Sequence, residues 1–163
     1  VEEVPSPEIG AAAIVPPDGA GSPRLGRAGT GRAVSAADTK ALHGHVRGQQ
    51  VAHWEFLPHR ELPGMTVAIL GLGNAGLEAA RVCKAMGMRV IGTKRRIPSE
   101  PIPYVDEVFP TSRQQECAAQ ADFVVVACAL TPETYHLVDA SFLSAMKRDA
   151  ALINVARGSV VKD

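Results

Sequence analysis

Apolar runs of strand length alternate with amphipathic stretches along the chain from residue 66 onward. Runs rich in β-branched residues predict strands, and a period near 3.6 residues predicts helices. The predicted strands cover 66–70, 88–92, 105–109, 122–128 and 150–155, and the predicted helices cover 75–86, 112–120 and 138–147. Because residues 123–127 are apolar at every position, that strand is expected in the middle of a parallel sheet. The alternation predicts an α/β fold with a doubly wound parallel sheet.

A G-x-G-x-x-G pattern joins the first predicted strand to the first predicted helix. Gly71 permits a tight turn, Gly73 lets the main chain approach a pyrophosphate, and Gly76 lets the helix lie close to the strand. Free main-chain amides at the start of the helix favour the two phosphates. A purely structural glycine turn is the alternative. In this strand–turn–helix setting, the pattern favours a Rossmann-like dinucleotide site.

Basic residues follow the second predicted strand. Lys94 stands eighteen residues after Gly76, near the position where an acid usually accepts the ribose hydroxyls, and Arg95 and Arg96 follow it. Positive charge here would attract a 2′-phosphate that a carboxylate would repel. The sequence therefore favours NADP(H) over NAD(H). The alternative is that these basic residues form a solvent-exposed loop without a ligand.

The first 36 residues differ from the rest of the chain. Half of them are Gly, Ala or Pro, and no aromatic residue occurs before Trp54. Such a segment buries too little apolar surface to offset its ordering entropy, so we expect residues 1–36 to form a mobile, disordered leader without strands or helices. Residues 37–163 are expected to form a partial dinucleotide-binding domain, beginning with a helix over 37–50 that Gly44 and Gly48 weaken.

Composition narrows the class of partner. With 17 basic and 17 acidic residues the chain carries no nucleic-acid footprint, and no apolar run approaches the length of a membrane span. Cys83, Cys117 and Cys128 lie in apolar patterns and are interpreted as small buried hydrophobes, which favours a cytoplasmic location. The spacing of His, Cys, Asp and Glu indicates no metal site.

Three motifs make the chain recognisable. Residues 67–76, 127–138 and 152–161, in this order and spacing, resemble the D-isomer-specific 2-hydroxyacid dehydrogenase family. The resemblance runs from about Trp54 to Asp163 and covers only part of the family's NAD(P)-binding domain. It implies a sheet that is incomplete at the C-terminus, with an unpaired edge after the strand over 150–155.

The resemblance also implies roles for individual residues. Asn74 and Ala75, in the glycine turn, match residues whose main chain meets the pyrophosphate. Cys128 matches a position beside the cofactor at the end of the fourth strand, where Ala129 replaces the family's usual proline. Val155 and Ala156 match a segment that approaches the nicotinamide. Arg157 matches both that segment and the catalytic arginine, which binds the substrate carboxylate and polarises the 2-oxo group. Arginine suits this task because its planar, permanently charged fork grips a carboxylate through two hydrogen bonds.

By resemblance, the activity is NAD(P)-dependent oxidoreduction at the CH–OH group of D-2-hydroxy acids, with substrates such as glyoxylate or hydroxypyruvate. The family's acid–base histidine and its glutamate would follow residue 163, so this piece is expected to turn over nothing alone. His136 matches a histidine without a catalytic part, and Glu133 is interpreted as a first-turn helix acid. A homodimer is expected of the full-length protein. A non-catalytic nucleotide sensor, similar to a corepressor, and a broken gene product are the alternatives.

Overall fold

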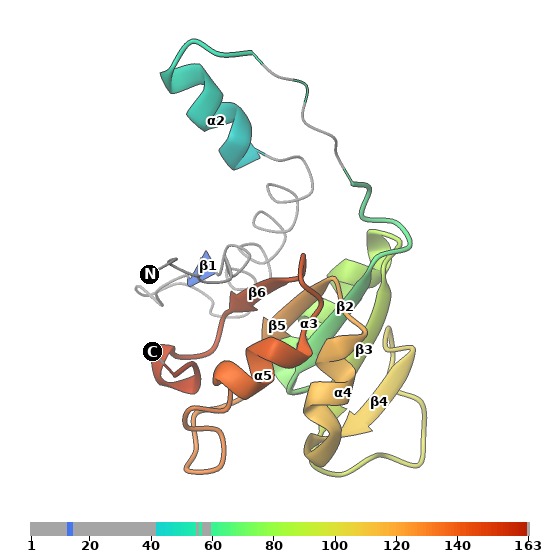
Figure 1. Ribbon diagram of the computed structural model, residues 1–163. Helices are drawn as coiled ribbons and strands as arrows, with labels where there is room; N and C mark the ends of the chain where they lie inside the picture. The colour runs from blue at the N-terminus through green and yellow to red at the C-terminus, as the bar shows by residue number, and fades with distance from the viewer. Residues whose placement is uncertain (1–12, 15–41, 55, 57–59, 163) are drawn as a thin grey trace, which may run out of the picture.

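The computed structural model describes residues 13–14, 42–54, 56 and 60–162. Six strands, all paired in parallel, form one sheet in the order β1-β6-β5-β2-β3-β4 (Figure 1). The strands are β1 (Ala13–Ile14), β2 (Thr66–Leu70), β3 (Arg89–Lys94), β4 (Glu107–Pro110), β5 (Phe123–Val126) and β6 (Ala151–Asn154). The helices are α2 (Leu42–Gln50), α3 (Asn74–Ala85), α4 (Gln114–Ala119) and α5 (Ala140–Ala145), with single 3-10 turns η1 (Thr111–Arg113) and η2 (Gly158–Val160). The predicted α/β class, with a parallel Rossmann-like sheet, is confirmed.

Each central strand is buried on both faces. In β2, Val67 and Ile69 belong to a core cluster that includes Ala80 of α3, whereas Ala68 and Leu70 belong to a second cluster with residues of α4 and α5. Alternate side chains of a strand point to opposite faces of the sheet, so α3 covers one face and α4 and α5 cover the other. This two-sided burial explains why the strands are apolar without alternation.

The predicted elements shift at their ends. Strand β3 runs two residues past the predicted end, to Lys94, because Lys94 continues the ladder opposite Pro110 of β4. Helix α5 begins at Ala140, later than predicted, because the Asp139 carboxylate accepts a hydrogen bond from the Phe142 amide at 2.8 Å and caps the helix there. The turns before it, over residues 132–136, are not helical, so the interpretation of Glu133 as a first-turn helix acid is wrong.

The prediction of an unpaired edge after the strand over 150–155 is also wrong. Strand β1 pairs in parallel with β6, with Ala13 opposite Ile153 and Ile14 opposite Asn154. The leader was expected to hold no strand, yet Ile14 lies in a short apolar stretch with the neighbouring Val15, and β-branched residues favour strands. The rest of the predicted mobile leader, and residues 37–41 of the predicted helix over 37–50, lie outside the described residues.

Ion pairs gather at the amino ends of the strands. Asp122, just before β5, accepts from the Thr66 amide at 2.8 Å and pairs with Lys147 at 2.8 Å. Asp106, just before β4, accepts from the Val90 amide at 2.8 Å and pairs with Lys84 at 2.6 Å. Each carboxylate thus joins a strand end to the helical layer or the loop beside it. This edge of the sheet is fixed by contacts within the chain.

Candidate nucleotide site

Two glycines of the turn after β2 are required by close packing. Gly71 has φ +101°, and a Cβ there would lie 2.8 Å from the Cα of Cys128. A Cβ on Gly76, in the first turn of α3, would lie 2.1 Å from the carbonyl oxygen of Gly71. No side chain fits at either position without moving main chain. The turn therefore brings α3 directly against the end of β2, as its glycine spacing predicts.

Gly73 has a different environment. It is exposed and extended, with φ −88° and ψ −167°, and a Cβ built on it would meet no atom within 4 Å. Gly73 is the N-cap of α3 and supplies no side-chain hydrogen bond to the first turn, which Asn74 and Ala75 open. The first-turn amides of a helix lack intrahelical acceptors and attract anions. The open space at Gly73 therefore leaves room for a pyrophosphate against the main chain.

Strand β3 holds this turn in place. The Gly71 amide donates to the Thr93 hydroxyl at 3.2 Å, and the Leu72 amide donates to the Thr93 carbonyl at 3.0 Å. Thr93 is 2% exposed. We did not predict its role, for which the only signal was a hydroxyl at the end of an apolar strand. Its two bonds tie the glycine turn to the neighbouring strand.

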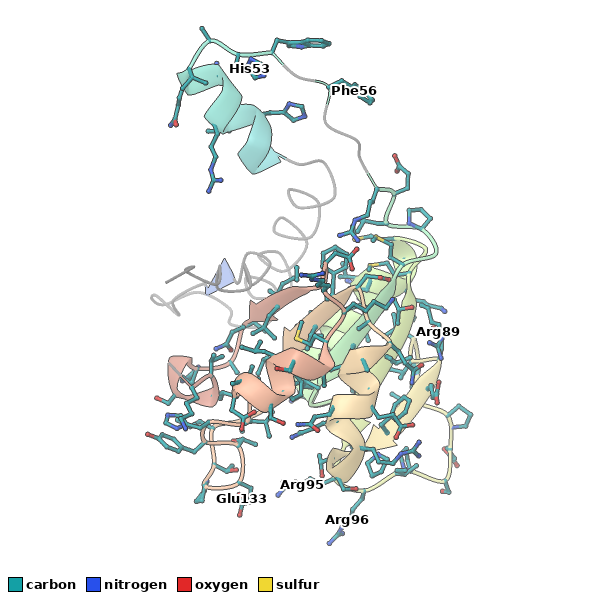
Figure 2. The ribbon with its side chains drawn as sticks, in the orientation of Figure 1. His53, Phe56, Arg89, Arg95, Arg96 and Glu133 are labelled. Carbon is teal, nitrogen blue, oxygen red and sulfur yellow. The ribbon has the colours of Figure 1, made fainter. Side chains whose placement is uncertain are left out.

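The basic cluster lies at the same edge of the sheet. The Lys94 ammonium donates to the Leu72 carbonyl at 3.3 Å, so this half-buried side chain reaches across the glycine turn. Arg95 and Arg96 are exposed, and Figure 2 shows both at the same end of the molecule as Glu133. Lys94 therefore contacts the glycine turn, and Arg95 and Arg96 follow it at the same edge of the sheet.

Cys128 contacts the turn from the opposite side. Its main chain limits the space around Gly71, and its side chain is half-buried. Burial raises the pKa of the Cys128 thiol, so the thiol stays protonated and neutral at physiological pH. Cys128 acts here as a packing residue beside the site.

The turn after β6 carries the predicted catalytic arginine. Asn154, 3% exposed, accepts from the Ala156 amide at 3.0 Å and donates through its amide nitrogen to the Arg157 carbonyl at 2.8 Å. Val155 continues the ladder by donating to the Val126 carbonyl at 3.1 Å. The exposed Arg157 side chain donates to the Ala156 carbonyl at 2.8 Å. Asn154, whose bracing role we did not predict, closes the turn that presents Arg157.

The structure brings the glycine turn, the basic cluster, Cys128 and residues 155–157 to one edge of the sheet, because they follow the carboxyl ends of parallel strands. His136 is stacked on Tyr135 with ring centroids 3.9 Å apart, and its amide donates to the Ser159 carbonyl at 3.0 Å. In the described ranges, no group of three His, Cys, Asp or Glu residues could hold a metal ion. None of the helices in these ranges is long and apolar enough to cross a membrane.

A parallel sheet with an open helix N-terminus at its switch point defines a dinucleotide-binding domain. The chain belongs to the D-isomer-specific 2-hydroxyacid dehydrogenase family, whose NAD-binding domain model matches residues 33–163. Among curated proteins, glyoxylate reductase of Thermococcus gammatolerans is 37% identical over 136 residues, which is 81% of this chain and 39% of that protein. Human glyoxylate reductase/hydroxypyruvate reductase is 44% identical over 98 residues, which is 59% of this chain and 29% of that protein.

Solved structures agree with this assignment. A probable 2-hydroxyacid dehydrogenase from Rhizobium etli, crystallised with NADP, HEPES and L(+)-tartaric acid, matches with a TM-score of 0.77 and 28% identity. The match covers 86% of this chain and 45% of that chain. The present chain therefore spans less than half the length of the relatives that it matches.

Proposed function

We propose that this chain is the nucleotide-binding part of an NADP(H)-preferring reductase of small 2-oxo acids, with glyoxylate or hydroxypyruvate as substrates. The open first turn of α3, with the Lys94 ammonium bonded to the glycine turn just before it, is the observation that carries the proposal. Residues 37–163 supply most of this domain, and β1 (Ala13–Ile14) adds an edge strand to its sheet. The full-length protein acts as a homodimer in the cytoplasm.

The residues present suit this chemistry. The amides of Asn74 and Ala75 would meet the pyrophosphate, and Lys94 and Arg95 would meet the 2′-phosphate. A bound nicotinamide supplies the hydride. Arg157 would grip the substrate carboxylate and stabilise the negative charge that develops on the carbonyl oxygen. The proton for that oxygen comes from the family's histidine, which would follow residue 163.

The cofactor preference is tested by changing the charge at Lys94. Replacing Lys94 with Asp places a carboxylate beside the glycine turn, so the ratio of NADPH to NADH affinity should fall by at least about tenfold. The dissociation constants of both nucleotides are measured by titration of the 163-residue chain. Arg148→Asp makes the same charge change near the amino end of β6 and should leave the ratio unaltered. An unchanged ratio in Lys94→Asp contradicts the NADP(H) preference.

The activity is tested on the full-length protein. NADPH oxidation is followed with glyoxylate, hydroxypyruvate and pyruvate, and the Arg157→Lys variant is compared with the parent. Lysine keeps the charge and loses the two-pronged grip, so kcat/KM should fall by at least about a hundredfold, about 2.7 kcal/mol of transition-state stabilisation. A protein that binds NADPH and reduces none of these acids would refute the assigned activity.

A further inference from the structure

Glu133 lies on a fixed loop after β5. The Thr134 hydroxyl accepts from the Thr131 amide at 2.7 Å and donates to the Ala129 carbonyl at 2.7 Å, which closes the loop around Glu133. The carboxylate itself is exposed, and helix α5 begins only at Ala140. The local structure therefore holds Glu133 in place without using its charge for helix capping.

Strand order brings this loop towards the basic cluster. Strand β2 lies between β5 and β3, so the loops after β5 and β3 flank the glycine turn on its two sides. The Thr131 hydroxyl, the main-chain amide of Glu133 and then the positive charge of Arg95 lower the pKa of Glu133. Figure 2 shows Glu133 and Arg95 at the same end of the molecule. The Glu133 carboxylate and the Arg95 guanidinium thus act electrostatically on one another, and Arg95 belongs to the cluster to which we assign the 2′-phosphate.

We infer that Glu133 is a specificity-determining residue, which weakens the binding of nucleotides that carry a 2′-phosphate and thereby sets the ratio of NADPH to NADH affinity. The inference rests on the proposed function, since it concerns the same site. A 2′-phosphate brings up to two negative charges towards Glu133 and must compete with it for Arg95. A 2′-hydroxyl carries no charge, so NADH meets neither cost.

The test uses Glu133→Gln in the 163-residue chain. Glutamine keeps the size of the side chain and removes the charge, so the dissociation constant for NADPH should fall by about three- to tenfold. The constant for NADH should change by less than about twofold. The gain for NADPH should shrink at high salt, because an exposed charge is screened there. The midpoint of thermal unfolding should stay that of the parent.

Two comparisons isolate the effect. Asp149→Asn removes one negative charge at the opposite edge of the sheet, where Asp149 pairs with Arg60 at 2.8 Å, and should alter neither dissociation constant. In an Arg95→Gln background, Glu133→Gln should lose most of its effect on NADPH, because the two charges act on one another. Equal changes for both nucleotides, or no change for either, would overturn the role of Glu133. A parent chain that binds neither nucleotide would instead overturn the proposed function.

Discussion

Substitutions at Gly73 and Gly76, in the same turn, should affect nucleotide binding and folding stability separately. A methyl group on Gly73 meets no atom within 4 Å, and the extended main chain at Gly73 suits any residue. The free energy of unfolding should therefore change by no more than about 1 kcal/mol in Gly73→Ala. The methyl group would stand where phosphate oxygens approach the first turn of α3. Nucleotide affinity should fall at least about tenfold, which corresponds to about 1.4 kcal/mol.

Gly76→Ala is the matched opposite case. Its methyl group would lie 2.1 Å from the Gly71 carbonyl oxygen, so α3 or the turn must move. Overpacking of this kind costs about 1–3 kcal/mol, and at the upper end the midpoint of thermal unfolding should drop by about 10 °C. Both variants are titrated with NADPH and melted in its absence. A stable Gly73→Ala variant that binds as tightly as the parent would refute the placement of the pyrophosphate at this turn.

Two further predictions concern stability. Hydrogen bonds from Lys84 and from the Val90 amide lower the pKa of Asp106. The stabilisation that ionised Asp106 provides is therefore complete above its pKa in the unfolded state, about 4, and is lost as pH falls through its lower pKa in the folded state. Asp106→Asn should therefore flatten the decline of the melting midpoint below pH about 4. Parallel declines in parent and variant would contradict this. Asn154→Ala leaves the turn that carries Arg157 with unpaired main-chain groups and should cost about 1–3 kcal/mol in chemical denaturation; an unaltered midpoint would show that the turn holds without the side chain.

Local patterns predicted the parts of the fold that depend on local chemistry. Strand β2 matches its predicted range residue for residue, because its apolar run is bounded by turn residues. The glycine turn was predicted because the spacing of its glycines follows directly from the steric requirements of the turn. Thr93 and Asn154 were missed because their roles depend on register and side-chain geometry, which no sequence period encodes. The pairing of β1 joins residues about 140 positions apart, so no local pattern could reveal it.

The charged residues at the amino ends of the strands stabilise the fold, and those at the carboxyl ends are available to a ligand. At the amino ends, the carboxylates of Asp122 and Asp106 already hold both a cation and a main-chain amide, so little capacity is left for a ligand. At the carboxyl ends, the side chains of Lys94 and Arg157 donate to neutral partners, the main-chain carbonyls of the turns themselves. A phosphate or carboxylate can displace a neutral carbonyl at modest cost, because a charge-assisted bond is roughly twice as strong as a neutral one. The cations that this fold leaves to neutral acceptors are therefore the ones that an anionic ligand can recruit.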